Sequence, residues 1–103
     1  MEVLNADKVR VKEEILSFFK KGVTKIDPDA ELYLFGSRTD MEKRGGDIDF
    51  LILSGKKLSS ETLRELKYSF WRQFGEQKVD LVNFTFEEDA TFKKLIMLDA
   101  IKL

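Results

Sequence analysis

The stretch that decides the fold runs from Leu32 to Leu53 and reads LYLFGSRTDMEKRGGDIDFLIL. Two apolar runs, typical of β-strands, enclose a polar loop. The first run ends in Gly36-Ser37, and the second begins with Asp47-Ile48-Asp49. Because alternate side chains of a strand point to the same face, we expect Asp47 and Asp49 to lie on one face, about 6–7 Å apart along the backbone.

This pair of acids indicates a cation site. Two carboxylates at the start of a buried strand repel each other and resist desolvation unless a cation lies between them. Carboxylate oxygens are hard ligands that suit Mg²⁺, and the backbone amides of the Gly36-Ser37 turn suit a phosphate. The stretch therefore predicts a site for a nucleotide that binds together with a metal ion.

The composition limits what kind of protein this is. The 103 residues show no linker, and we expect one domain over residues 1–103. The net charge of −1 argues against extended nucleic-acid binding, which needs clustered positive charge. The lack of Cys and His excludes disulfides, thiolate nucleophiles, zinc sites built on these residues and imidazole catalysis. With no signal peptide and no membrane-spanning run, we expect a soluble, cytoplasmic protein without a membrane partner.

The pattern of apolar residues predicts alternating helices and strands. We expect strands at 31–35, 48–53 and 78–84, and a short edge strand within 100–103. A first helix is expected over about 6–21, with Gly22 as its C-terminal stop. A second is expected over 60–74, with Ser59 as N-cap and Gly75 at its end. Thr85-Phe86-Glu87-Glu88 has the form of a capping box and predicts a third helix through about Met97.

The connections between these elements predict their topology. The loop between the first two strands is too short for a crossover helix, so these strands should run antiparallel. The helix over 60–74 is long enough for a crossover, so the strand at 78–84 should lie parallel to the strand at 48–53. Asp80 then falls at the same edge of the sheet as Asp47 and Asp49. We therefore predict an α/β protein of the α+β type, with a small mixed sheet flanked by helices.

These residues resemble the nucleotidyltransferase superfamily that includes DNA polymerase β, and more closely its stand-alone minimal members. The resemblance rests on Phe35-Gly36-Ser37-Arg38, Gly46-Asp47-Ile48-Asp49-Phe50 and Val79-Asp80-Leu81, and it spans nearly the whole chain. It implies that Asp47 and Asp49 are the metal-binding catalytic pair and that Asp80 is the third acid. It also implies that Gly36 and Ser37 hold the nucleotide phosphates, where Arg38 could add positive charge.

The resemblance also implies a reaction and a partner. The expected reaction moves a nucleoside monophosphate, here AMP from ATP, onto a hydroxyl at a site with two Mg²⁺ ions about 3.5–4 Å apart. Many minimal members form a toxin–antitoxin pair with a small helical protein of the HEPN class, and characterised pairs adenylylate a tyrosine of the toxin. We therefore expect a HEPN-type partner, with a homo-oligomer as a further possibility, because the chain has no room for an acceptor-binding domain.

Two alternatives compete with this interpretation. The protein could be a non-catalytic, nucleotide-binding antitoxin that neutralises its partner by occlusion; the three acids argue against this, because occlusion needs none of them. It could instead transfer a nucleotide to a small molecule, as aminoglycoside nucleotidyltransferases do; the lack of a second substrate-binding domain argues against that.

Overall fold

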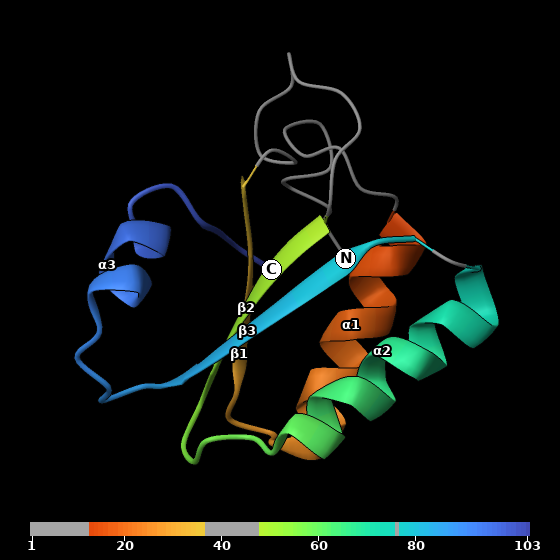
Figure 1. The fold of residues 1–103 in the computed structure, drawn as a ribbon, viewed down its shortest axis with the longest axis horizontal. Helices are drawn as coiled ribbons and strands as arrows, with labels where there is room; N and C mark the ends of the chain where they lie inside the picture. The colour runs from red at the N-terminus through yellow and green to blue at the C-terminus, as the bar shows by residue number, and fades with distance from the viewer. Residues whose placement is uncertain (1–12, 37–47, 76) are drawn as a thin grey trace.

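The fold was determined as a computed structural model, which describes residues 13–36, 48–75 and 77–103. Within them the chain forms, in order, α1 (Glu13–Ile26), β1 (Glu31–Phe35), β2 (Ile48–Ser54), α2 (Ser60–Phe74), β3 (Val79–Thr85), α3 (Thr91–Met97) and β4 (Ile101–Lys102). These elements form three layers, with α1 and α2 on one face of the sheet and α3 on the other (Figure 1). The α+β class predicted from the sequence is confirmed.

The sheet has the strand order β3-β2-β1-β4. β1 runs antiparallel to both β2 and β4, whereas β2 and β3 are parallel. The antiparallel pairing predicted from the short loop and the parallel pairing predicted from the helical crossover are therefore both confirmed. The expected edge strand at the C-terminal end is also confirmed, as β4. This order leaves β2 inside the sheet and makes β3 an edge strand.

Aromatic residues fill the core between the sheet and the two long helices. Phe19 of α1, Phe50 of β2 and Phe70 of α2 are fully buried. The ring of Phe19 lies 4.6 Å from that of Phe50 and 5.0 Å from that of Phe70, measured between centroids. Aromatic rings at such distances contribute beyond the area they bury. They fix both helices against the centre of β2.

The predicted end of the first helix is wrong. Gly22 is not a C-terminal stop, because α1 continues through it to Ile26. A Cβ atom at position 22 would lie only 2.7 Å from Cδ1 of Leu66 on α2. Gly22 thus permits the close approach of the two helices. In the sequence, a glycine required by such a tertiary contact looks the same as a glycine that ends a helix. The predicted start at Ala6 lies outside the described residues.

Both ends of α2 agree with the sequence prediction. The Ser59 hydroxyl accepts a hydrogen bond from the backbone N–H of Thr62 at 3.0 Å, as an N-cap does. At the other end Gly75 has a φ of +89°, and its N–H donates to the carbonyl oxygen of Trp71 at 2.9 Å. The crossover that brings β3 beside β2 is therefore well defined at its start and at its finish.

A buried polar cluster holds the chain between β2 and α2. The side-chain amide of Asn83, on β3, donates to the carbonyl oxygen of Ile52 and to the hydroxyl of Ser54, each at 3.0 Å. Its oxygen accepts from the N–H of Leu58 at 2.7 Å. Because each of these groups has a partner, the burial of Asn83 carries no unsatisfied polar atom. This cluster lies at the opposite end of β2 from Asp49.

The predicted start of the third helix is also wrong. The capping-box contact does form, since the N–H of Thr85 donates to the carboxylate of Glu88 at 3.1 Å. However, β3 extends to Thr85, so this contact closes a turn after the strand, and α3 begins only at Thr91. The ammonium of Lys93 then donates to the carbonyl oxygens of Thr85, Phe86 and Glu88 at 3.0, 2.7 and 3.0 Å. Lys93 thereby holds the short helix onto the turn.

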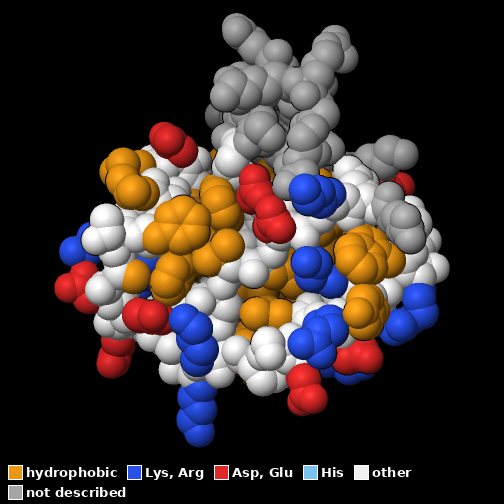
Figure 2. All heavy atoms as spheres, in the orientation of Figure 1, with side chains coloured by type: hydrophobic (Ala, Val, Ile, Leu, Met, Phe, Trp, Pro, Cys, Tyr) orange, Lys and Arg blue, Asp and Glu red, His pale blue; other side chains and the backbone are white. Residues whose placement is uncertain are grey.

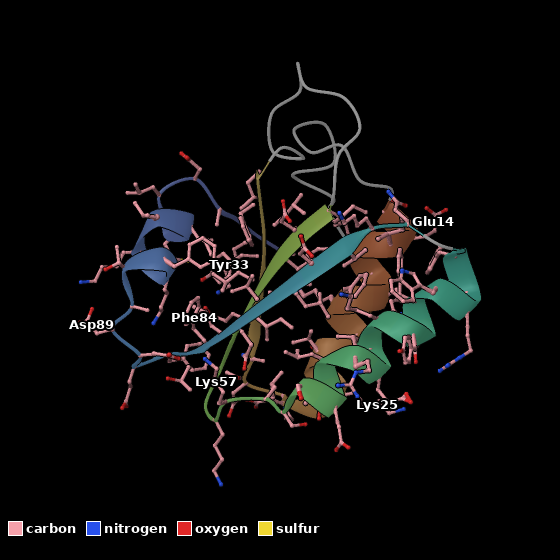
Figure 3. The ribbon with its side chains drawn as sticks, viewed as in Figure 1. Glu14, Lys25, Tyr33, Lys57, Phe84 and Asp89 are labelled. Atoms are coloured by element: carbon pink, nitrogen blue, oxygen red, sulfur yellow. The ribbon has the colours of Figure 1, made fainter. Side chains whose placement is uncertain are left out.

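The core under α3 is smaller than the core under the long helices. It consists of Tyr33, Leu51, Leu53 and Ile96, with Phe35, Val82, Phe84 and Ala100 packed against them. Tyr33 and Phe84 lie between the sheet and α3 (Figure 3). In the described part of the chain, every helix is too short or too polar to cross a membrane.

Candidate functional site

Two of the predicted acids meet at one edge of the sheet. In the parallel pairing of β2 with β3, Asp49 and Asp80 are direct partners. Neighbouring strands lie about 4.8 Å apart, and paired residues point to the same face. Leu51 and Val82, two residues further along each strand, belong to the core under α3. Both acids therefore project from the α3 face, where Asp49 is half-buried and Asp80 is exposed.

Gly36 lies directly against one of these acids, Asp49. It follows β1, whose last residue, Phe35, pairs with Asp49. The φ of Gly36 is +84°, a conformation that side chains other than hydrogen rarely allow. A Cβ atom at this position would overlap the Asp49 carboxylate, since it would lie 3.2 Å even from Cγ. Glycine thus makes the turn and also leaves the space that the carboxylate occupies.

Three of the six predicted site residues are therefore brought together: Gly36, Asp49 and Asp80. The other three, Ser37, Arg38 and Asp47, lie outside the described residues. Among residues 13–36, 48–75 and 77–103, no three acids gather closely enough to hold a metal ion. The catalytic and nucleotide-binding roles of all six residues stay predictions.

The described part of this site fits a hard divalent cation. Its side-chain donors are carboxylate oxygens from two strands that start at the same edge, the donor type that Mg²⁺ prefers. Because Gly36 has no side chain, its backbone lies directly beside the Asp49 carboxylate; a Cβ atom would otherwise separate the two. A phosphate bound to the metal could therefore approach the turn closely. Backbone turns of this kind can bind anions through their amides.

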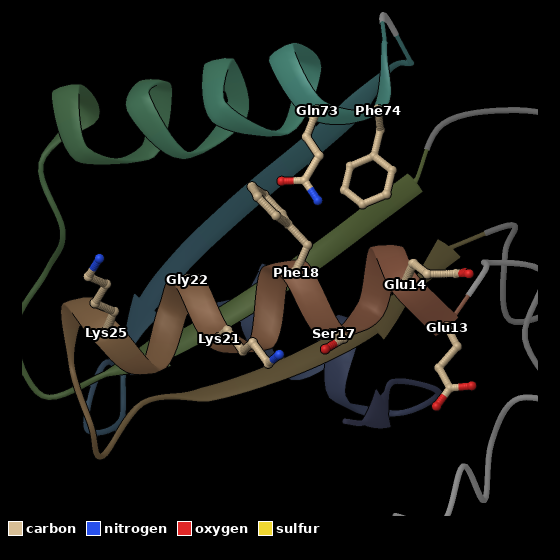
Figure 4. Close-up of a pocket in the computed structure, with 9 residues that line it drawn as sticks. All are labelled: Glu13, Glu14, Ser17, Phe18, Lys21, Gly22, Lys25, Gln73 and Phe74. Atoms are coloured by element: carbon tan, nitrogen blue, oxygen red, sulfur yellow. The ribbon is translucent and has the colours of Figure 1, made fainter.

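A second surface feature lies apart from these acids. It is an open groove of about 690 Å³ between α1 and the C-terminal end of α2 (Figure 4). Phe18 and Phe74 contribute apolar surface to it, while Glu14 and Lys21 contribute opposite charges. None of the described site residues lines this groove. It lies with the long helices, on the other side of the sheet from Asp49 and Asp80.

A polar cluster on β1 was not predicted from the sequence. The Tyr33 hydroxyl donates to the Glu31 carboxylate at 2.8 Å, and the ammonium of Lys102, on β4, donates to the same carboxylate at 3.2 Å. Burial, and then the Glu31 carboxylate, raise the pKa of Tyr33 to about 12. The hydrogen bond from Tyr33 and the charge of Lys102 lower the pKa of Glu31. Glu31 begins β1, far from Gly36, so the cluster anchors β4 rather than the acids.

Comparison with known proteins places this geometry in a family. The model of the nucleotidyltransferase domain matches residues 12–103, which is most of the chain. The chain therefore belongs to the nucleotidyltransferase domain family. No curated protein matches the sequence.

Solved structures share the fold at low sequence identity. A crystal structure of a mutant of the toxin–antitoxin MntA–HpeT is 21% identical with a TM-score of 0.64, and the match covers 91% of this chain and 72% of that one. A second mutant of the same toxin–antitoxin is 19% identical with a TM-score of 0.63, covering 90% and 71%. A protein from Shewanella oneidensis is 18% identical with a TM-score of 0.58, covering 89% and 71%. At these identities the similarity shows the fold.

Proposed function

We propose that the protein is a Mg²⁺-dependent nucleotidyltransferase that moves AMP from ATP onto a hydroxyl of a partner protein of the HEPN class. The observation that carries this proposal is the meeting of Asp49, Asp80 and Gly36 at one edge of the sheet. Membership of the nucleotidyltransferase family supports the reaction class. The structural similarity to a toxin–antitoxin supports the kind of partner.

The residues of the site have separate roles in this reaction. Asp49 and Asp47 would hold the metal, and Asp80 would hold it from the neighbouring strand. The amides of Gly36 and Ser37, with the charge of Arg38, hold the phosphates that leave. A bound Mg²⁺ supplies charge neutralisation at the phosphate oxygens and at the attacking oxygen. The protein itself mainly supplies position, as is usual in phosphoryl transfer.

The transfer balances as a substitution at the α-phosphorus. The acceptor oxygen forms a bond to this phosphorus, and the bond to the β-phosphate oxygen breaks, so that pyrophosphate leaves. The acceptor hydroxyl loses its proton, for which Asp80 is the base in our proposal. The sequence contains no His for this role. A carboxylate at the edge of the site lies where an incoming hydroxyl can reach it.

The test is a labelling assay with ATP labelled at the α-phosphate, Mg²⁺ and the purified HEPN-class partner. The comparison is an Asp47→Asn/Asp49→Asn variant, with Asp29→Asn as a matched control. Asp29 is an exposed acid in the turn between α1 and β1, at the opposite end of β1 from Gly36. We expect label on the partner with the native protein and the control, and none with the double variant.

The same assay separates the enzyme from a non-catalytic antitoxin. Absence of label with any of the four nucleoside triphosphates, while the complex still forms and the partner is still silenced, would overturn the proposal. The protein would then act by occlusion. Label on a small hydroxyl compound but not on the protein would instead indicate a small-molecule transferase.

A further inference from the structure

The helix α3 exposes more apolar surface than it buries. Among its residues only Ile96 is buried, whereas Phe92 and Leu95 are 52% and 58% exposed. Leu98, directly after the helix, is 76% exposed. Residues three apart lie on the same side of a helix, so these three side chains form one stripe, here called the α3 patch. Figure 2 shows hydrophobic side chains gathered over this part of the molecule.

The two leucines of the α3 patch are not what holds α3 on the sheet, whereas the ring of Phe92 packs against that of Phe84, with 6.3 Å between centroids. Ile96 anchors the helix to Leu51, Leu53 and Tyr33 from below. Lys93 fixes its start through three carbonyl oxygens. A helix of seven residues has little stability of its own in water, so these contacts hold it in place. The outward-facing Leu95 and Leu98 contribute little to this packing, and contiguous exposed apolar residues mark interaction sites.

The α3 patch lies on the same face of the sheet as Asp49 and Asp80. Asp49 and Asp80 project from the face of the sheet that α3 covers. Leu51 and Leu53, beneath α3, lie two and four residues beyond Asp49 on β2, which corresponds to about 7 and 13 Å. A standard interface covers about 800 Å² of each partner, equivalent to a disc roughly 30 Å wide. A protein that binds the α3 patch therefore also reaches the acids.

The charges around the patch favour one kind of occupant. The segment 86–99 carries four acids, Glu87, Glu88, Asp89 and Asp99, against two lysines. Lys93 is engaged with three carbonyl oxygens. Lys94 pairs with Asp89 and Lys57 pairs with Glu88, so within the described residues the acids of the rim without an ion pair are Glu87 and Asp99. Two copies of this chain joined through the patch would bring two acidic rims together, and like charges across an interface are unfavourable. A partner with an apolar surface and a basic rim fits better than a second copy.

We infer that the α3 patch is the docking surface for the partner protein that brings the acceptor hydroxyl, through an apolar area rimmed by Lys or Arg. This inference rests on the proposed function and adds to it the place where the partner binds. Of the two acids in the described residues, Asp80 is exposed and Asp49 is half-buried, so a docked partner can reach this pair. The docked partner then holds its hydroxyl over Asp49 and Asp80.

The test compares variants of three exposed apolar residues, two in the α3 patch and one on α2, on the opposite face of the sheet. Leu98→Glu, and separately Leu95→Glu, place a charge in the patch. Tyr68→Glu places the same charge on α2, where Tyr68 is 45% exposed. Affinity for the purified HEPN-class partner is measured by titration calorimetry, and thermal unfolding shows that each variant is folded. We expect both Leu variants to bind at least tenfold more weakly and Tyr68→Glu to bind as the native protein does.

Binding at native affinity by Leu98→Glu and Leu95→Glu would overturn the inference. So would a dimer of the isolated chain, seen by sedimentation, that these two substitutions dissociate, because the occupant would then be a second copy. Nucleotide transfer is measured separately. If the Leu variants weaken binding but the native complex transfers no nucleotide, the proposed function fails while the docking surface stands.

Discussion

Gly36 lies so close to the carboxylate of Asp49 that a side chain at position 36 would overlap it. This contact joins the turn after β1 to the acid near the start of β2. The residue that makes the turn after β1 is therefore also the residue that leaves space for the acid. Substitution at this one position tests both effects, and the chain provides a matched control for the backbone effect alone.

We expect Gly36→Ala to impair function and stability together. Both Gly36 and Gly75 have positive φ, at +84° and +89°, so Ala should cost roughly 1–3 kcal/mol of unfolding free energy at either position. Only at Gly36 does the added Cβ meet a neighbour, the Asp49 carboxylate; at Gly75 there is nothing within 4 Å. Binding of Mg-ATP, measured by calorimetry, should weaken for Gly36→Ala and stay native for Gly75→Ala. Equal binding by both variants would contradict this role for Gly36.

The two paired acids should behave as one unit. We expect Asp49→Asn and Asp80→Asn each to lower the rate of nucleotide transfer by about 100-fold or more, because in our proposal each removes a carboxylate that holds the metal ion. The double variant should be little worse than either single variant, since residues that act together are not additive. Single-turnover rates measure this. Multiplication of the two losses in the double variant would show that the acids act independently.

Lys93 and Lys94 are neighbours whose substitutions should differ sharply. Lys93 donates to three carbonyl oxygens at the turn before α3, so Lys93→Met should cost about 1.5–3 kcal/mol of unfolding free energy. Within the described residues Lys94 pairs only with Asp89, and both side chains are more than two-thirds exposed. Lys94→Met should therefore cost less than about 1 kcal/mol. Urea denaturation measures both, and similar losses would show that Lys93 does not anchor the helix.

The buried hydroxyl of Tyr33 should lose its proton only at a pH well above the ordinary range for tyrosine. Burial and the neighbouring Glu31 carboxylate raise its pKa to about 12, above the ordinary value of 10.0. The folded state thus favours the protonated hydroxyl, and this stabilisation is complete below pH 10 and is lost as the pH rises toward 12. In a Tyr68→Phe background, which leaves Tyr33 as the single tyrosine, tyrosinate absorbance reports its pKa directly.

Adding Glu31→Gln to that background removes the acceptor charge, and the midpoint of the Tyr33 titration should move down. The contact between Tyr33 and Glu31 would be contradicted if the midpoint lay near the ordinary value while Glu31 is present. It would also be contradicted if Glu31→Gln left the midpoint unchanged. Tyr33→Phe is the matching control for stability. Without the hydroxyl, the unfolding free energy of this variant should fall less than that of the native protein as the pH rises from 10 toward 12.

The sequence predicted the strands well because their signals are local. Apolar runs end at turn residues on either side of β1 and β2, and the lengths of the connections determine their directions. The partnership of Asp49 with Asp80 follows from these directions and needs no other information. Ser59 and Gly75 likewise mark the ends of α2 through their own backbone chemistry.

Features that depend on tertiary contacts were not predicted. Gly22 was interpreted as a helix end, yet its reason is the Leu66 side chain on another helix. The box at Thr85 and Glu88 forms its hydrogen bond, but the strand before it continues and the helix begins later. The buried amide of Asn83 gave no signal, because its partners lie on β2 and in the loop before α2. Such contacts join residues far apart in sequence, and periodicity does not report them.

The crossover through α2 has a consequence for the order of events as the chain folds. β1 and β2 can pair as soon as both exist, which already sets Gly36 beside Asp49. We expect β3 to join them only after α2 has formed, because it pairs in parallel with β2 across this crossover and such non-local pairing is slow. A half-folded chain therefore has one acid in place without its counterpart. In our proposal such a chain is chemically silent, and transfer starts only once the last strands have joined the sheet.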